Sequence, residues 1–398
     1  MSIRRSRALL ALCAALLVAS CAAVDQFGSR IDDANKNSQD ALNTETLLNI
    51  LRASRMQPLN FVAITQITGG QSESLNTGLP TITIGPEQTV AQHQFQVSNS
   101  VTSGVSSGFQ SNPLVSTAFQ TAMLSPITPR EAALLLAAHP REPVFNAILR
   151  QITFRQTASG RVYTFTGDTI NDTADDCQAQ YDQAPPEKLI NLARSCNYTL
   201  FVNYLAVFVL AGLSVELLPA PPSKAGKSGG SGSGGGGSAD TGSDKSAQSV
   251  VGHICFNPSQ ASENVPQPRC GTLKAAKGQQ PPLVFLPGFG DVEVEFGFRS
   301  PIGAFNHFGD LLRQPKYNIA NYHTKESTLV IQPGEPYLNI TYGAGRGCFS
   351  GVAYGGGFYC VPADSAHTAM LFDILIQLRN MSIQTTDLNS AFTVRLTN

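Results

Sequence analysis

The spacing of apolar residues along the chain predicts both helices and strands. Between residues 40 and 52, four leucines recur at the three- and four-residue intervals of a helix with one apolar face. Residues 61–67 are instead apolar at neighbouring positions, which predicts a strand that is buried on both faces. Gly69 and Gly70 follow this strand, and we expect it to end there.

A long polar stretch separates this strand from the next predicted helix. Residues 71–125 are rich in Ser, Thr, Gln, Asn and Gly. We expect a helix over residues 129–138, because Thr128 can cap its first turn and Pro129 suits its first position. Short alternating segments within the polar stretch predict strands over residues 81–84, 94–97 and 115–121.

The same spacing rules predict further elements on both sides of residues 228–238, which are all Gly or Ser. Helices and strands mixed in this order predict an α+β fold. Before the Gly/Ser segment we expect a hairpin over 146–157 and 161–166, a helix over 186–205 and a strand over 214–218. After it we expect strands over 283–286 (extended by 292–296), 328–331 and 391–396, a helix from Pro301 capped by Ser300, a hairpin over 348–354 and 357–361, and a helix over 364–380.

The apolar run over residues 200–218 has two interpretations. It is nineteen residues long and Glu216 is its one charged residue, so its length would allow a membrane span. Polar residues such as Asn203 interrupt the run, and Gly212 divides it. We therefore favour a buried helix that breaks at Gly212 and leads into a strand.

The N-terminus has the features of an export signal. Three arginines precede an apolar run over residues 8–18, which ends in small residues and Cys21. The run is too short for a membrane span. Its end resembles the bacterial lipobox, in which the cysteine is acylated and becomes the new N-terminus. The alternative is an ordinary signal cleaved near Ala22, with loss of Cys21.

Lipid attachment at Cys21 would anchor the mature chain. By resemblance to Gram-negative lipoproteins, Ala22 rather than Asp after the cysteine implies sorting to the outer membrane, where two or more acyl chains anchor a protein stably. Five segments follow from these patterns: residues 1–20 as signal peptide, 21–37 as tether, 38–220 as an N-terminal α+β domain, 221–249 as a flexible Gly/Ser-rich linker and 250–398 as a C-terminal α+β domain.

Composition narrows the partners and the chemistry. A net charge of -1 with 14% charged residues provides no basic field for nucleic acid. Of the eight cysteines, six remain beyond the signal and Cys21, and an even number in an oxidising compartment predicts disulfides. Six cysteines allow 15 connectivities, and their grouping favours three local bridges: Cys177–Cys196, Cys255–Cys270 and Cys348–Cys360. His253 and Cys255 lie close together without a second pair, so we expect no metal and no cofactor.

Three local patterns imitate catalytic motifs. Residues 104–108 match G-x-S-x-G around Ser106, but polar loops flank them where a hydrolase needs a strand and then a helix. Residues 285–290 resemble the strand-to-loop turn of α/β-hydrolases without a serine elbow downstream. Glu293 and Glu295 project from one side of an alternating segment, as glycosidase acids could. Nothing else supports these groups, and we expect the protein not to be an enzyme.

Several short motifs resemble those of one protein family. The segment T-L-L-N-I-L-R-A-S-R at residues 46–55 is similar to the start of an uncharacterised family of proteobacterial outer-membrane lipoproteins. Ser-Pro-Ile at 125–127 and 300–302, and Gly-Phe-Tyr at 357–359, fall in the order of that family's motifs. The resemblance covers most of the mature chain and implies architecture and location rather than a reaction. Arg52 and Arg55 within the first motif could pair with acids or face a partner.

Three functional hypotheses follow. The leading one is a non-enzymatic protein anchored by lipid to the outer membrane, facing the periplasm. It would be a structural or accessory subunit of a secretion- or export-type assembly, with copies of itself or other envelope proteins as partners. The second is a lipoprotein that binds glycan or peptidoglycan through exposed aromatic residues: Tyr342, Tyr354, Phe358 and Tyr359. The third is a cell-surface hydrolase that uses Ser106 or the Glu293/Glu295 pair.

Overall fold

The computed structural model divides the chain into two compact units. We call one the ribbon unit (residues 1–42, 60–119 and 384–398) and the other the body (residues 43–59 and 120–383). The residues that the structure describes are 32, 35–76, 100–219, 250–261, 265–273, 281–318, 336–343 and 347–383.

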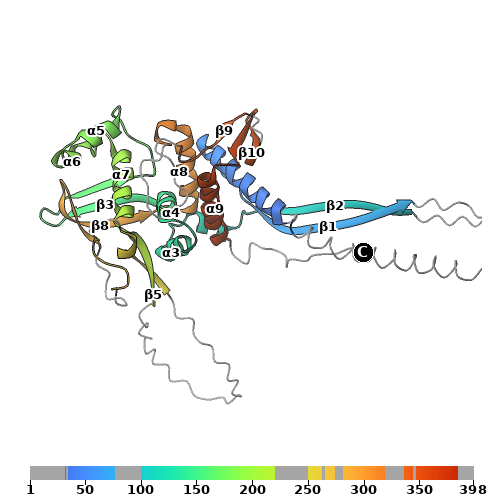
Figure 1. Ribbon diagram of the computed structural model, residues 1–398, viewed down its shortest axis with the longest axis horizontal. Coiled ribbons are helices and arrows are strands. Elements are labelled where there is room, and N and C mark those ends of the chain that lie inside the picture. The colour runs from blue at the N-terminus through green and yellow to red at the C-terminus, as the bar shows by residue number, and fades with distance from the viewer. Residues whose placement is uncertain are drawn as a thin grey trace, which may run out of the picture. The chain divides into compact units, whose positions relative to one another are not determined.

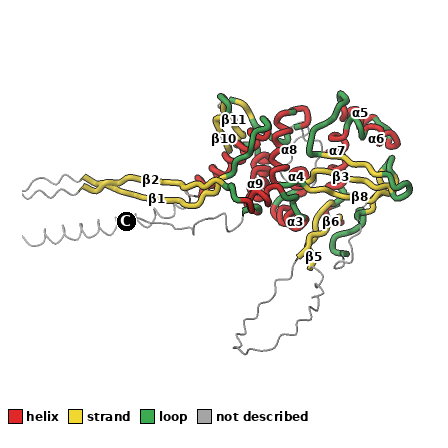
Figure 2. Tube along the Cα trace, turned by 180° about the vertical axis from the view of Figure 1, so that it is seen from behind, coloured by secondary structure: helices red, strands yellow, loops and turns green. Residues whose placement is uncertain are grey.

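A two-stranded antiparallel ribbon forms most of the described part of the ribbon unit (Figures 1 and 2). Strand β1 (Val62–Asn76) pairs with β2 (Ser100–Pro113) along their whole length. At the base, the amide of Leu114 donates to the carbonyl of Phe61 at 2.9 Å. The rings of Phe61 and Phe119 meet edge-on there, with 5.9 Å between their centroids. The base of the ribbon is therefore held by backbone pairing and by one aromatic contact.

Two predictions in this region are wrong. β1 does not end at Gly69 but continues to Asn76, because the ladder with β2 pairs its backbone whatever the side chains are. Residues 115–121, which we expected as a strand, mostly belong to helix α2 (Thr117–Leu124). The hydroxyl of Ser116 accepts the amide of Phe119 at 3.0 Å, and this capping bond favours a helix over the alternating pattern.

A four-stranded antiparallel sheet, in the order β4-β3-β8-β7, forms the centre of the body. Phe154 on its inner face meets Tyr204, Phe208 and Phe289 edge-on, with 4.9 to 6.0 Å between ring centroids. Tyr204 and Phe208 belong to α7 (Asn197–Leu210), which lies across the sheet (Figure 1) and encloses this aromatic core. The strands are β3 (Leu149–Gln156), β4 (Val162–Thr166), β7 (Leu283–Leu286) and β8 (Gly290–Phe298).

Local capping signals start two helices of the body where we expected them. Helix α3 (Pro129–Ala138) begins with a capping box. The side chain of Thr128 accepts the backbone amide of Glu131, and the side chain of Glu131 accepts the backbone amide of Thr128. Helix α8 (Pro301–Arg313) begins after Ser300, whose hydroxyl accepts an amide of the first turn at 3.1 Å. Both predictions are confirmed to the residue at their starts.

Two further helices bring the ends of the body together. Residues 35–54 form one helix, of which the part from residue 43 belongs to the body. Arg379 of α9 (Ala366–Met381) pairs with Glu45 of that helix, with 3.2 Å between nitrogen and oxygen. The remaining helical segments are α4 (Arg141–Ile148), α5 (Cys177–Gln183), α6 (Leu189–Leu192) and the 3₁₀ turns η1 (Pro186–Lys188), η2 (Pro258–Gln260) and η3 (Pro315–Tyr317).

Two small sheets and three disulfides complete the body. β5 pairs with β6, and β11 lies between β9 and β10. The three expected bridges, Cys177–Cys196, Cys255–Cys270 and Cys348–Cys360, are confirmed. The strands are β5 (Leu213–Pro219), β6 (Val250–Phe256), β9 (Thr341–Tyr342), β10 (Cys348–Tyr354) and β11 (Gly357–Pro362).

Helices and antiparallel sheets together confirm the α+β class, but the expected division at residues 221–249 is wrong. β5 and β6 lie on opposite sides of that segment and pair with each other. The central sheet likewise combines β3 and β4 from before the segment with β7 and β8 from after it. Backbone pairing between strands so distant in sequence leaves no local pattern, so the sequence suggested a domain boundary inside one unit.

Three other element boundaries differ from the prediction. The helix expected over residues 186–205 is divided into η1, α6 and α7, with Cys196 immediately before α7. Residues 292–296 do not extend β7 but form part of β8, its antiparallel partner. The strand expected from residue 146 begins at Leu149, because residues 146–148 end α4.

The apolar run over residues 200–218 is divided as we favoured. Helix α7 ends at Leu210, Gly212 takes a φ of +92°, and β5 follows. Leu205 and Phe208 of this helix are fully buried, so the run belongs to the core of the body. None of the helices described by the structure is both long enough and apolar enough for a membrane crossing.

Several predictions lie outside the described residues. They include Cys21, the signal, most of the tether, the linker and the strands expected over 81–84, 94–97, 328–331 and 391–396.

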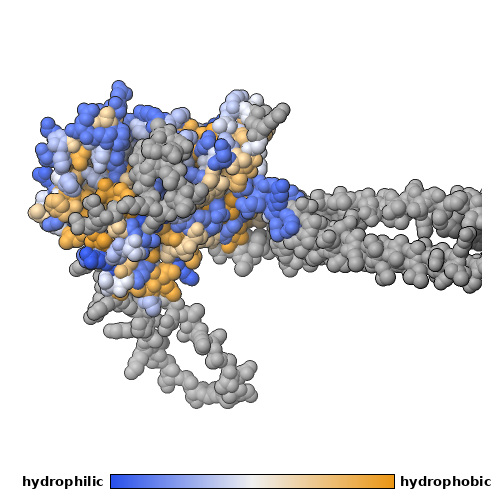
Figure 3. Space-filling view, viewed as in Figure 1, coloured by the Kyte–Doolittle hydropathy of each residue, from blue (hydrophilic) through white to orange (hydrophobic). Residues whose placement is uncertain are grey.

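In the view of Figure 3, hydrophilic residues cover α5 and α6, and apolar residues gather around β5 and the neighbouring strands. The large exposed apolar side chains on those strands are Leu217, Val251, Leu283 and Phe285.

Candidate functional site

The small sheet β9–β11–β10 brings three of the four predicted aromatic residues onto one face. Tyr342 on β9 is the register partner of Tyr359 on β11, and their rings meet edge-on at 5.4 Å. Tyr354 on β10 is the partner of Gly357, which lies two residues before Tyr359 and therefore on the same face. We call Tyr342, Tyr354 and Tyr359 the tyrosine face.

Phe358, the fourth predicted residue, lies on the opposite face of this sheet. Neighbouring residues of a strand point to opposite faces, so Phe358 and Tyr359 cannot share a platform. The ring of Phe358 covers Gly351, where its nearest atom lies 2.7 Å from the position that a Cβ would occupy. The expected group of four aromatic ligands is therefore corrected to a group of three.

Glycines make room for this arrangement. Gly355 and Gly356 form the turn between β10 and β11 with φ values of +59° and +83°, which glycine adopts without a steric penalty. The ring of Tyr342 lies over Gly357, at the place that a Cβ would take. A side chain at residue 357 would therefore displace Tyr342 from the face.

Two polar residues that follow the N-terminal helix complete the tyrosine face. The guanidinium of Arg55 lies over the ring of Tyr354, 4.7 Å from its centroid, and its Nη2 donates to the hydroxyl of Tyr359 at 3.0 Å. The hydroxyl of Tyr354 donates to the side-chain carbonyl of Gln57. Both tyrosine hydroxyls are thus held by residues about 300 positions earlier in the chain.

A strained turn at Met56 sets the direction of these two residues. The amide of Met56 donates to the carbonyl of Ala53 at 2.9 Å, and that of Gln57 to Arg52 at 2.9 Å, which is the Schellman pattern of a helix end. Met56 occupies the left-handed position of this motif, with a φ of +56°, where glycine is usual. This conformation costs a non-glycine residue about 1 to 2 kcal/mol, and the surrounding hydrogen bonds hold it.

The tyrosine face is open and positively charged. Tyr342 is 73% exposed, and Arg55 is also exposed. Among the described residues, no carboxylate lies within ion-pair distance of Arg55. An exposed aromatic ring and an available guanidinium are suited to bind a ligand with an apolar face and an acidic group.

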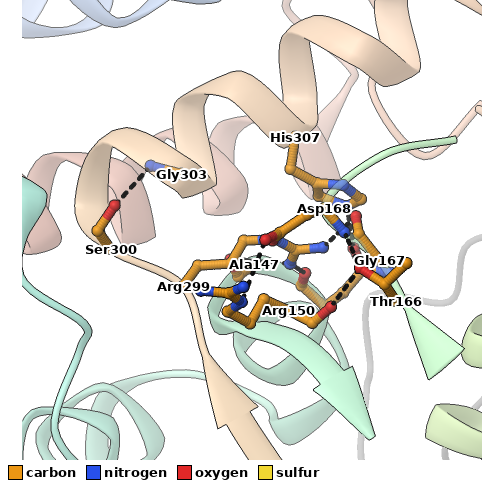
Figure 4. Close-up of polar contacts among 10 residues, drawn as sticks. Ala147, Arg150, Thr166, Gly167, Asp168, Arg299, Ser300, Gly303 and His307 are labelled. Atoms are coloured by element: carbon orange, nitrogen blue, oxygen red, sulfur yellow. Dashed lines mark hydrogen bonds and ion pairs between the residues drawn. The ribbon is translucent and has the colours of Figure 1, made fainter. Parts of the chain in front are cut away.

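A second polar cluster lies inside the body, around Arg299 (Figure 4). The side chain of Arg299 is fully buried and donates to the carbonyls of Asn146 at 2.6 Å, Ala147 at 3.2 Å and Gly167 at 2.7 Å. Its Nε lies 3.5 Å from a carboxylate oxygen of Asp168. Arg299 precedes α8, while its partners end α4 or follow β4, so one side chain joins three elements.

The charge of Arg299 also acts on His307 of α8. Burial lowers the pKa of Arg299 to about 10, against the opposing effect of Asp168, so the guanidinium stays charged at neutral pH. Burial and then the charge of Arg299 hold the pKa of His307 well below its ordinary value of 6.5. The neutral ring contacts the side-chain oxygen of Asn146 through Nε2 at 3.1 Å. These groups bond to one another and to backbone carbonyls, so the cluster has a structural role in the body.

Each of the three imitations of catalytic motifs is part of a strand or of the turn between two strands. Ser106 lies within β2 opposite Gly70, and the strand continues past it, so the strand-turn-helix of a nucleophile elbow is not formed there. Residues 285–290 include the end of β7, the tight turn over residues 287–289 and the first residue of β8. Glu293 on β8 lies 4.0 Å from Arg155 of the neighbouring strand, and Glu295 is exposed two residues further on.

Sequence reasoning did not identify Gln57, Arg299 or His307, and left the role of Arg55 open. A charged residue directly before the Ser-Pro start of α8 was the available signal for Arg299. No such signal existed for Arg55, because its partners lie about 300 residues away. In the part of the chain that the structure describes, no group of three or more His, Cys, Asp or Glu is placed to hold a metal ion.

Comparisons of this chain with protein-family models, with curated proteins and with solved structures found no match.

Proposed function

We propose that this chain is a non-enzymatic protein, anchored by lipid at Cys21 to the bacterial outer membrane, that serves as a subunit of an envelope assembly. The observation that supports this role is the β1–β2 ribbon. The lipobox-like end of the signal and the resemblance of residues 46–55 to outer-membrane lipoproteins support the location.

The ribbon is long and has only two strands. At about 3.3 Å per residue, its fourteen or fifteen residues extend for about 45 Å. Among the described residues, no third strand pairs with β1 or β2. A single two-stranded ribbon is marginally stable in water, and the outer edge of a sheet can accept a strand from another chain.

The sequence of the ribbon also suits association. Glu73 is the one charged residue in the two strands, although charges and prolines are the usual protection of an exposed edge. By register, Ile67, Phe109 and Val105 belong to one alternating set of positions. The positions between them form the other alternating set. From Gln66 to Asn76, and in the part of β2 that pairs with this segment, that set contains only Gln, Thr, Ser, Asn and Gly. A ribbon with one polar set and one partly apolar set favours burial of a single side in an assembly.

Excision of the ribbon tests this proposal. Ile64 and Ser111 are register partners, so an Asn-Gly turn can join them in place of residues 65–110. The full chain, extracted in mild detergent, should have the mass of a multimer or of a larger complex by light scattering, and the excised chain that of a monomer. A full chain that is monomeric at every concentration, or an excised chain of unchanged mass, would contradict the proposal.

A glycan-binding role is the second candidate, and the tyrosine face favours it. Tyr342 presents an exposed ring beside two other tyrosines, and such rings can stack on the apolar face of a sugar. Sedimentation with purified peptidoglycan sacculi tests this role. The full chain should pellet with the sacculi, and Tyr342→Ala should pellet less than the matched control Phe285→Ala, which removes an exposed ring from β7.

A further inference from the structure

We propose that the tyrosine face and Arg55 form a site for a glycan that bears carboxylate groups. This inference rests on the glycan-binding role and adds the chemical class of the sugar. Tyr342 provides the stacking ring, and Arg55 provides the charge that selects acidic sugars. Uronic acids and N-acetylmuramic acid share this chemistry, since each joins a carboxylate to a sugar ring.

The platform is fixed before a ligand arrives. Tyr342 rests over Gly357 and meets Tyr359 edge-on, so its ring has a defined position although it is 73% exposed. Disulfide Cys348–Cys360 joins β10 and β11 behind the face. A preformed platform loses little conformational entropy when a ligand binds, which favours affinity.

The guanidinium of Arg55 is held beside the platform and keeps binding capacity. It stacks on the ring of Tyr354 and donates one hydrogen bond to the hydroxyl of Tyr359. Arginine has five N–H donors in a planar fork, so an edge remains for a carboxylate to bind in bidentate geometry. Because no described carboxylate neutralises Arg55, an acidic ligand would meet an uncompensated positive charge.

The strained turn at Met56 supports a positioning role. Its left-handed conformation turns the chain so that Arg55 and Gln57 both reach the tyrosine hydroxyls. Backbone strain of this kind persists where the surrounding contacts hold it, and it is concentrated at binding sites. The strain therefore agrees with the charge and the exposure in assigning the site to this face.

Calorimetric titration of the full chain in detergent tests the inference with three glycans. The acidic probes are the disaccharide of N-acetylglucosamine and N-acetylmuramic acid, and tetragalacturonate; the neutral probe is chitotetraose. We expect at least one acidic probe to bind about tenfold more tightly than chitotetraose, the equivalent of one charge-assisted hydrogen bond. Preference for the first acidic probe would indicate peptidoglycan strands without stem peptides, in which the lactyl carboxylate is free, as the source, and preference for the second an acidic polysaccharide.

Variants separate charge from stacking. Arg55→Gln should lose the preference for acidic probes and change chitotetraose binding less than about twofold, whereas Tyr342→Ala should weaken every probe about tenfold. Arg55→Lys keeps the charge and should retain part of the preference, which provides a result even if Arg55→Gln fails to fold. Phe285→Ala, the matched control, should change nothing.

The two levels of the proposal fail differently. Equal affinity for acidic and neutral probes, or an unchanged preference in both Arg55 variants, would overturn the assignment of acidic sugars and leave glycan binding in place. If none of the three probes nor the sacculi bind the full chain, both the inference and the glycan-binding role are overturned.

Discussion

The β1–β2 ribbon and the central sheet of the body are both antiparallel, and they differ in what covers them. In the body, Ile152, Val292 and Val294 are fully buried, and α7 packs on the sheet through Tyr204 and Phe208. The ribbon has two strands and no third in the described chain. Pairing of backbone groups contributes little net stability, whereas burial of apolar surface contributes most of it. From this comparison we expect the body to fold alone and the ribbon to gain stability from a partner.

Covalent and polar joints add to this difference. All three disulfides lie in the body, where they close segments of 12 to 19 residues. Such bridges typically stabilise a fold by about 2 to 4 kcal/mol each. Arg299 adds a buried joint between α4, β4 and α8. Within the described residues, the ribbon unit has no comparable joint, so changes to the body should affect stability more than changes to the ribbon.

The largest expected effect comes from the buried joint of the body. Arg299→Met removes the donors of three backbone carbonyls and should lower the free energy of unfolding by about 3 to 5 kcal/mol in urea titration. Arg150→Met is the matched control, because Arg150 also pairs with Asp168 but is half exposed, and it should cost less than about 1 kcal/mol. Equal losses in the two variants would contradict the role of burial.

Acid should weaken the body through its buried histidines. Burial lowers the pKa of His367 to about 4, so the unfolded chain takes up this proton near pH 6.5 and the folded chain does not. The free energy of unfolding should therefore be flat above about pH 6.5 and fall by up to about 3 kcal/mol towards pH 4. His307, whose pKa is also lowered, acts in the same direction. His367→Gln should reduce the slope, and an unchanged slope would refute this assignment.

Relief of strain should have a smaller effect of opposite sign. Met56→Gly removes the steric cost of a φ of +56° and should raise the free energy of unfolding by about 1 kcal/mol. Met56→Ala is the control, because alanine keeps the Cβ and should bring no gain. A gain for alanine equal to that for glycine would show that the backbone at residue 56 is not strained.

The smallest effect is expected from the ribbon itself. Replacement of residues 65–110 by Asn-Gly should change the free energy of unfolding of the body by less than about 0.5 kcal/mol, because the ribbon belongs to a separate compact unit. Urea titration followed by far-ultraviolet circular dichroism measures this value. A loss of several kcal/mol would mean that the body depends on the ribbon.

Elements with local signals could be predicted from the sequence, and those that depend on distant pairing could not. Helices α3 and α8 begin where Thr128 and Ser300 indicated, because a cap acts within one turn. The three disulfides followed from the local grouping of cysteines. The division of the chain was wrong, because the pairing of β3 with β8 joins strands that are more than 130 residues apart.

The candidate site shows the same limit. The aromatic residues of the site were identified by type, and alternation within the predicted strand already separates Phe358 from Tyr359. The register of β9 and β10 with β11 was needed to show that Tyr342 and Tyr354 share the face of Tyr359. Arg55 reached the site through a hydrogen bond to Tyr359 that spans 304 positions, which no periodicity reveals. Sequence therefore indicated which residue types to consider, and long-range packing decided which of them meet.

Hydrogen exchange tests the contrast between ribbon and body most directly. Amide exchange of the full chain would be measured by mass spectrometry in its assembled form and after dilution to the monomer. We predict that residues 62–76 and 100–113 are protected in the assembly and exchange rapidly in the monomer, while β3 and β8 stay protected in both. Equal protection of the ribbon in monomer and assembly would contradict the claim that the ribbon needs a partner.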